Sequence, residues 1–199
     1  MWKYNRILFA VFLVCFTLPL PLRAADGATL SRQEQIVQTL GDDALKELVQ
    51  KEITQAQREK KMAKLLDKYF DLDRIAKLSL GRNWKIANDT QKKEYLKLFR
   101  HMVIRTYASR FGEYSGEVFE VTGYRELNKR DSLVHSKIVP ADRSPVTVDW
   151  RLRAGKDSDF LVIDVMVEGV SMMQTQRSEF DSLISQHNGD FDAFLAALK

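Results

Sequence analysis

Cysteine and histidine are scarce in this sequence. Its 199 residues include one cysteine, Cys15, and three histidines, His101, His135 and His187. Because a disulfide needs two cysteines, the chain cannot form an internal disulfide framework. The histidines have no spacing typical of a metal site, and the sequence contains neither a glycine-rich phosphate loop nor a GxSxG nucleophile motif. We therefore expect no catalytic residue, no metal site and no cofactor.

The N-terminal segment has little charge and many apolar side chains. Lys3 and Arg6 precede an apolar run from Ile7 to Leu18, and small residues follow. This run has 12 residues, whereas a membrane-spanning helix needs about 18 or more. The layout predicts a secretory signal peptide over residues 1–24 and an exported, periplasmic product. A retained anchor and a lipoprotein at Cys15 are less favoured alternatives, the second because large residues precede the cysteine.

Neither sign of charge is in strong excess. The chain has 31 Lys and Arg residues against 27 Asp and Glu residues. Loss of residues 1–24 removes three basic residues and no acidic one, which leaves 28 against 27 and a net charge of +1. Proteins that bind nucleic acid carry a clear basic excess or a basic patch. We therefore expect no nucleic-acid partner.

Helical spacing dominates the first half of the mature chain. Ser31 and the glutamate three residues later form a capping-box pattern, which predicts a helix that ends at Gly41. A second helix is expected from Asp42 to Ile53, because apolar residues recur there at helical spacing. The polar run Thr54–Lys61 is interpreted as the solvated end of that helix or as a loop.

Two helices further along the chain have clearer boundaries. An aspartate, Asp71 or Asp73, caps a segment that Gly81 ends. Asn88 then opens a long helix, whose broad apolar face continues to Gly112.

The hydrophobic period changes from about 3.6 to 2 in the second half of the chain. Helical spacing then returns near the C-terminus, with a break at Gly189. Together these patterns predict one α+β domain over residues 25–199, with N-terminal helices packed over a curved four- to five-stranded antiparallel sheet and C-terminal helices. Such a sheet, curled against helices, can enclose an apolar pocket. The strands are expected over residues 116–125, 133–139, 146–153 and 160–167.

Asp164 and Glu168 form the most conspicuous acidic pair. They lie four residues apart on the same face of a predicted strand, so about 13 Å separates them. Paired carboxylates in glycoside hydrolysis stand closer together. We therefore expect a solvated pair, or one paired with Arg151 or Arg153 of a neighbouring strand. A small α+β enzyme that uses Asp164 as a base remains an alternative, as does an envelope chaperone or scaffold with an open apolar groove.

Four stretches of the sequence resemble the MlaC family, also called toluene-tolerance auxiliary proteins. The resemblance covers nearly the whole mature chain. Its sharpest parts are the spacing of phenylalanine, leucine-glycine and tryptophan in the first stretch and the EGVSM sequence in the last. The stretches are YFDLDRIAKLSLGRNW (residues 69–84), KKEYLKLFRHMVIRTYASRF (92–111), VDWRLR (148–153) and VIDVMVEGVSMMQTQRSEF (162–180).

This resemblance implies a periplasmic lipid carrier that is not an enzyme. Members of the family pass phospholipid between an inner-membrane MCE-domain complex of an ABC transporter and an outer-membrane lipoprotein complex. The acyl chains are held inside the protein and the headgroup stays near water. A related branch accompanies hopanoid synthesis, so a hopanoid or sterol-like lipid is an alternative ligand.

A lipid-binding cavity is expected between the long helix and the sheet. Arg100, Arg105 and Arg110 of that helix either meet a phosphate headgroup or an acidic partner, or form an ordinary solvated face. The side chains expected to line the cavity are Phe99, Val103 and Tyr107 on the helix, and Val121, Val148, Trp150, Val165 and Val167 on the strands.

Overall fold

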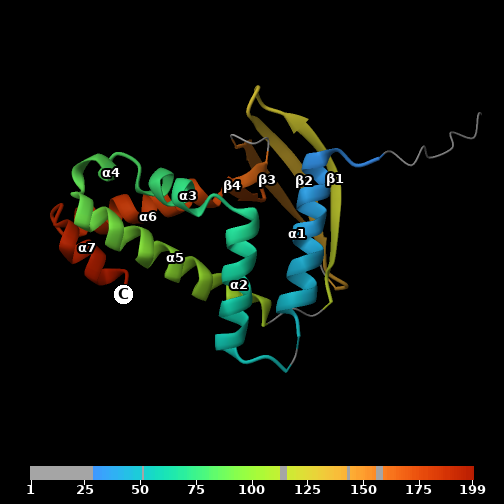
Figure 1. Cartoon of the computed structure of the whole chain (residues 1–199), viewed down its shortest axis with the longest axis horizontal. Helices are drawn as coiled ribbons and strands as arrows, with labels where there is room; N and C mark the ends of the chain where they lie inside the picture. Colours follow the sequence, from blue (N-terminus) through green and yellow to red (C-terminus); the bar gives the residue numbers. More distant parts are fainter. Residues whose placement is uncertain (1–28, 51, 113–115, 143, 156–158) are drawn as a thin grey trace, which may run out of the picture.

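A computed structural model shows a helical group beside an antiparallel sheet (Figure 1). The structure describes residues 29–50, 52–112, 116–142, 144–155 and 159–199, and the predicted signal peptide lies outside them. The described elements are α1 (Arg32–Leu48), α2 (Gln55–Tyr69), α3 (Leu72–Leu80), α4 (Asn83–Ile86), α5 (Asp89–Phe111), β1 (Val118–Glu126), β2 (Asp131–Val139), β3 (Val146–Ala154), β4 (Phe160–Val167), β5 (Val170–Ser171), α6 (Met172–Gln186) and α7 (Phe191–Ala197).

The five strands form one open sheet in the order β1-β2-β3-β4-β5, and every neighbouring pair is antiparallel. The predicted α+β class is therefore confirmed. A tight turn joins β4 to the short strand β5. Its two central residues, Glu168 and Gly169, have φ values of 49° and 76°. Left-handed backbone at both positions is what a two-residue hairpin turn of type I′ requires, and glycine adopts it without strain.

The first helix is continuous through Gly41, contrary to the predicted break there. Helix α1 begins after the Ser31 cap, whose capping box with Glu34 is present, and it ends at Leu48. A Cβ atom on Gly41 would lie 2.5 Å from the ring of Phe119 on β1. Glycine occupies this position because the helix and the strand approach closely there, and the residue does not end the helix.

The polar run after residue 54 is helical, so its interpretation as a loop or a solvated helix end was wrong. Thr54 and Gln57 form a reciprocal capping box that opens α2. The residues that follow are mostly Gln, Glu, Lys and Arg, which favour helix even without an apolar stripe. The boundaries of α3 and α5 agree with the prediction, because Asp71 caps α3, Gly81 ends it and Asn88 caps α5.

Two apolar clusters hold the elements together. One joins α1 and α2 to the inner face of the sheet through side chains such as Leu48, Leu66 and Val134. The other joins α3, α5, α6 and α7 around Tyr95, which is fully buried and donates a hydrogen bond from its phenol to the carbonyl of Ala76 at 2.8 Å.

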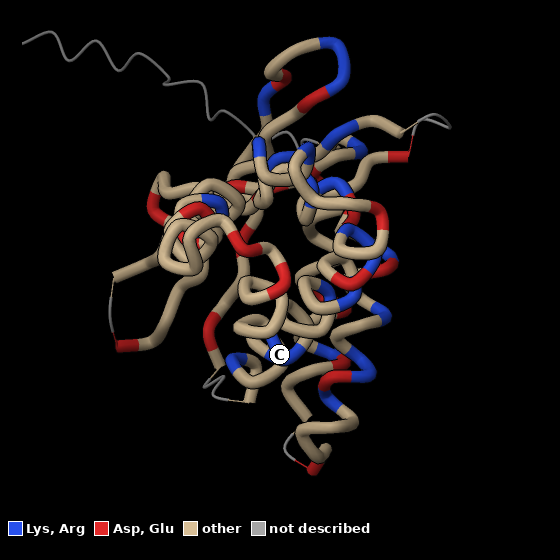
Figure 2. Tube along the Cα trace, turned by 90° about the vertical axis from the view of Figure 1, so that its left-hand side faces the viewer, with Lys and Arg blue, Asp and Glu red and all other residues tan. Residues whose placement is uncertain are grey.

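Lys and Arg positions are interspersed with Asp and Glu positions along the chain trace, as Figure 2 shows. Within the described ranges, no helix has both the length and the apolar character needed to cross a membrane. Arg151 and Arg153 do not pair with Asp164 or Glu168 as expected, but with Asp131 at the start of β2.

Candidate functional site

An apolar cavity lies where the two clusters meet. Its volume is about 360 Å³, and it is partly open to solvent. Ligand pockets in proteins typically measure roughly 300–1,000 Å³. Its wall is formed by Leu40, Ala44 and Leu48 of α1; Met62, Leu65 and Leu66 of α2; Phe70; Leu72, Ile75 and Ser79 of α3; Phe99, Met102, Val103, Thr106, Tyr107, Arg110 and Phe111 of α5; Trp150 of β3; Asp164, Val165 and Val167 of β4; and Met172, Met173 and Gln176 of α6.

Helix α5 supplies the longest part of this wall. Its lining residues recur at spacings of three and four from Phe99 to Phe111, so they form one continuous helical face. At 1.5 Å per residue, this face extends about 18 Å. The cavity is therefore long enough for an extended apolar chain.

Methionine is unusually frequent in the cavity wall. Four of the six methionines of the chain line it, namely Met62, Met102, Met172 and Met173. A thioether side chain is unbranched and polarisable, so it adapts to apolar groups of different shape. Such a wall suits a ligand with flexible and variable hydrocarbon chains.

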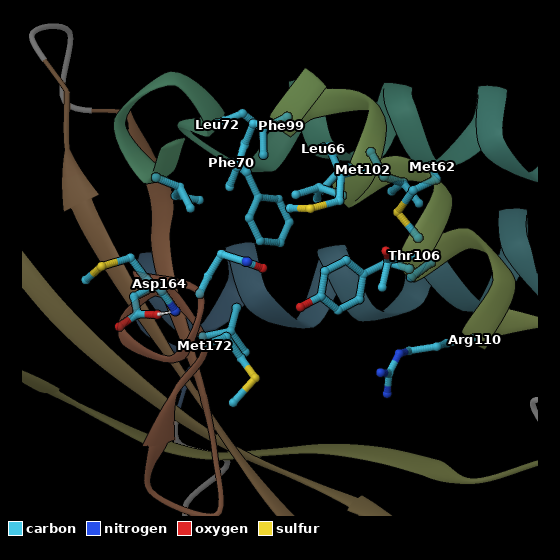
Figure 3. A pocket seen from close by; sticks show the side chains of 18 of the residues that line it. Met62, Leu66, Phe70, Leu72, Phe99, Met102, Thr106, Arg110, Asp164 and Met172 are labelled. Carbon is cyan, nitrogen blue, oxygen red and sulfur yellow. Dashed lines mark hydrogen bonds between the residues drawn. The ribbon is translucent and has the colours of Figure 1, made fainter. Parts of the chain in front are cut away.

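Polar side chains occupy the ends of the cavity. In Figure 3, Asp164 lies beside the strands and Arg110 lies on the opposite side, with Leu66, Phe70 and Met102 across the space between them. Arg110 is exposed, and Tyr107 is 40% exposed, so this end forms the rim. Partial burial of its phenol raises the pKa of Tyr107 above the ordinary value of 10.0. The hydroxyl therefore stays protonated at neutral pH and can donate a hydrogen bond.

Asp164 connects β4 to the start of α6. Its side chain accepts a hydrogen bond from the Ser171 hydroxyl at 2.6 Å and another from the backbone N–H of Met173 at 3.1 Å. Each carboxylate oxygen is thus used at the N-terminus of a helix. Glu168 has a different partner, because its carboxylate accepts from the backbone N–H of Thr147. The two acidic residues therefore have separate structural contacts.

Six of the eight side chains predicted to line a cavity do so. They are Phe99, Val103, Tyr107, Trp150, Val165 and Val167.

Val121 and Val148 lie outside the lining. Val121 is on β1, which α1 contacts, and its side chain packs against the apolar cluster that contains α1. Val148 is 4% exposed. Ser136 of β2 lies directly across from Val148 in the sheet, and its hydroxyl accepts a hydrogen bond from the indole N–H of Trp150. This contact places the indole beside Val148, so Trp150 takes the position at the cavity wall.

Helices α1, α2, α3 and α6 contribute walls that were not predicted from the sequence. Their lining residues do show a signal, which is an apolar stripe at helical spacing, as in Leu40, Ala44 and Leu48. Core residues have the same spacing, so the pattern alone cannot distinguish a cavity wall from filled core. The three arginines separate clearly: Arg100 forms a bidentate pair with Asp67, Arg105 is exposed away from the lining, and Arg110 lies at the rim.

Histidine and acidic residues do not gather into a metal site in the part of the chain that the structure describes. The Nδ1 atom of His135 instead lies 2.9 Å from a carboxylate oxygen of Asp149 on the adjacent strand.

Comparison with known proteins identifies the family of this fold. The family model described as MlaC protein matches residues 38–199. The chain belongs to the MlaC family. The resemblance inferred from the sequence is thereby confirmed.

A solved structure similar to this MlaC-family chain is that of a phospholipid-binding protein from Ralstonia solanacearum, in complex with a phospholipid. The two share 22% sequence identity with a TM-score of 0.69, and the match covers 83% of this chain and 93% of the other. The two proteins therefore have the same fold over most of their lengths.

Proposed function

We propose that this protein is a phospholipid carrier that holds acyl chains in its apolar cavity. The observation that supports this most is the cavity itself, which is lined mostly by apolar and thioether side chains and opens at a polar rim. Membership of the MlaC family and the phospholipid complex of the Ralstonia solanacearum protein point to the same ligand class.

The energetics of lipid transfer favour a carrier of this design. A phospholipid has on the order of 30 methylenes, each worth about 0.8 kcal/mol on leaving water, or about 24 kcal/mol in total. Free lipid therefore crosses an aqueous compartment very slowly. A bilayer offers the same chains a similar gain, so exchange between the membrane and an apolar cavity can be nearly neutral. Direction must then come from partner proteins.

The headgroup is expected at the rim, with the chains inside. Arg110 supplies a cation there, and Tyr107 supplies a hydroxyl donor from the same helix. A guanidinium can bind two phosphate oxygens at once, which orients a phosphodiester. The buried part of the cavity contains no basic residue, so a headgroup is better placed at the rim than inside.

The MlaC family match and the N-terminal segment support a proposal about compartment and partners. A signal peptide over residues 1–24 would export the chain to the periplasm. There it would receive or deliver phospholipid at an inner-membrane MCE-domain ABC transporter complex and at an outer-membrane lipoprotein complex. This proposal includes no catalytic step, and the two structural hydrogen bonds of Asp164 support its role as a helix cap over that of a base.

The proposal is tested by filling the cavity. Val103→Trp places an indole on the lining face of α5, whereas Val118→Trp places one on an exposed position of β1 that is 53% accessible. Each protein is purified without detergent, extracted with organic solvent and analysed by mass spectrometry. We expect phospholipid in the wild type and in Val118→Trp, and several-fold less in Val103→Trp.

The same measurement decides between the alternatives. Absence of lipid from the folded wild type would reject the carrier function. Extraction of a hopanoid or sterol-like lipid in place of phospholipid would keep the carrier and change its ligand. An enzyme that depends on Asp164 requires turnover that is lost in Asp164→Asn, and a chaperone requires bound polypeptide in place of lipid.

A further inference from the structure

One polar atom inside the cavity has no partner. Ser79 lies on the last turn of α3, lines the cavity and has an exposed fraction of 0%. Within the described residues, its hydroxyl makes no hydrogen bond. Buried hydroxyl groups are usually satisfied, because leaving one unpaired in apolar surroundings destabilises the fold. An alanine would avoid this cost and would also favour the helix more strongly.

The position of Ser79 along the cavity follows from the contact between α3 and α5. The carbonyl of Ala76, one turn before Ser79, accepts the hydrogen bond from Tyr95. Phe99 lies one turn after Tyr95 on α5 and is the first residue of the lining face. Ser79 is therefore at the Phe99 end of the cavity. Figure 3 shows Phe99 and Arg110 on different sides of the cavity, so Arg110 is at the other end.

The distance between these two ends determines which carbons of a bound acyl chain lie near Ser79. Phe99 and Arg110 are 11 residues apart on one helix, which corresponds to about 16 Å along its axis. An alkyl chain with bonds of about 1.5 Å and angles of about 111° advances about 1.25 Å per carbon, so about 13 carbons span that length. A chain whose headgroup lies at Arg110 thus meets Ser79 in its distal half.

We propose that Ser79 forms a specificity subsite for lipids whose acyl chain carries a hydroxyl group in its distal half. The Ser79 hydroxyl donates to, or accepts from, the hydroxyl of the chain, and the neighbouring apolar residues Ile75, Phe99 and Met102 exclude water from this hydrogen bond. An unmodified chain leaves Ser79 unpaired and is bound less well. This inference rests on the proposed carrier function and adds a ligand preference to it.

A competition between two matched lipids tests the subsite. Ricinoleoyl and oleoyl chains differ by one hydroxyl, which lies in the distal half of the ricinoleoyl chain. Delipidated mature protein is equilibrated with vesicles that contain equal amounts of the two phosphatidylethanolamines, and the bound lipids are then extracted and quantified by mass spectrometry. One buried hydrogen bond predicts enrichment of the ricinoleoyl lipid by about five-fold in the wild type.

Variants assign the preference to one side chain. Ser79→Ala should bring the ratio close to one while total lipid content stays the same or rises. Ser178→Ala, at an exposed position of α6, should retain the wild-type ratio. If Ser79→Ala fails to fold, the wild-type ratio and the Ser79→Cys variant still test the subsite. Because a thiol is a weak hydrogen-bond donor, Ser79→Cys should lose most of the enrichment.

The outcomes separate this inference from the proposed function. Equal binding of both lipids by the wild type, or an unchanged enrichment in Ser79→Ala or Ser79→Cys, overturns the subsite. The carrier function is unaffected by either result. Failure of the wild type to bind either lipid rejects the carrier function itself.

Discussion

Asp131 is a buried carboxylate that pairs with two arginines. Its side chain is fully buried and accepts hydrogen bonds from Arg153 at 2.5 and 2.7 Å and from Arg151 at 2.6 Å. These guanidiniums hold the pKa of Asp131 far below its ordinary value of 3.8. The ion pairs join the start of β2 to the end of the neighbouring strand β3.

Asp131→Asn is expected to lower the free energy of unfolding at pH 7 by about 2–3 kcal/mol, because it removes the charge and leaves two arginines without their partner. The folded-state pKa is depressed, so this stabilisation is fully present above pH 3.8 and declines as the pH falls below that value. Urea denaturation at pH 7 and at pH 3 measures both effects. Asp159→Asn, which removes an exposed ion pair with Arg32, serves as the control and should cost less than about 1 kcal/mol. An equal loss in the two variants would contradict this account.

At the same scale, the sequence was informative about side chains on α5 and less so about side chains on the strands. The lining residues Phe99, Val103 and Tyr107 followed from helical spacing, because one helical face must be buried. On the strands, alternation predicts which side chains share a face but not which part of that face is covered. Val121 and Trp150 both face inward, yet α1 packs at β1 and the cavity lies near β3 and β4. That difference depends on tertiary packing between distant segments.

At the scale of elements, the start of α6 is attached to the sheet through the Asp164 carboxylate of β4. Met172 and Met173 begin this helix and line the cavity. Ser171 caps the helix, and the Asp164 carboxylate ties both the cap and the Met173 amide to β4. This attachment fixes one wall of the cavity relative to the sheet.

Asp164→Ala is expected to lower stability by about 2 kcal/mol, since two hydrogen bonds to a buried carboxylate are lost. It should also increase amide hydrogen exchange at Met173 and speed the release of bound lipid to acceptor vesicles, because the wall at α6 loosens. Asp190→Ala is the matched control. It removes the cap of α7, whose residues are not part of the cavity wall, and should cost about 1 kcal/mol without changing release. Equal release rates from the two variants would show that α6 does not control the exit of lipid.

The boundaries of helices were predicted correctly where a capping side chain marks them. The prediction was wrong where packing between distant segments determines the role of a residue. Asp71, Gly81 and Asn88 identified the ends of α3 and the start of α5 correctly, because capping is a local interaction. Gly41 is a glycine, as many helix-ending residues are, but it does not end α1. Its role is set by the ring of Phe119, which lies on a strand more than seventy residues away in the sequence. Local sequence carries no information about that contact.

For the whole molecule, the cavity lies between two separate apolar clusters, and α5 contributes to both of them. Filling the space therefore adds contacts to each cluster and to the helix that connects them. A ligand that binds only the folded state stabilises it by an amount that grows with the logarithm of ligand concentration over Kd. Bound lipid should consequently behave as part of the hydrophobic core.

Removal of lipid is expected to lower the thermal midpoint by about 5–10 °C. This range follows from about 2.7 kcal/mol of stabilisation at a ligand concentration of 100 times Kd, and from a shift of about 2–4 °C per kcal/mol for a domain of this size. Differential scanning calorimetry of lipid-loaded and delipidated wild type measures it. Val103→Trp, with its cavity filled, should show little difference between the two preparations, whereas Val118→Trp should behave like the wild type. Identical midpoints for loaded and delipidated wild type would mean that the lipid binds outside the fold, and the cavity would then have no role in carrying it.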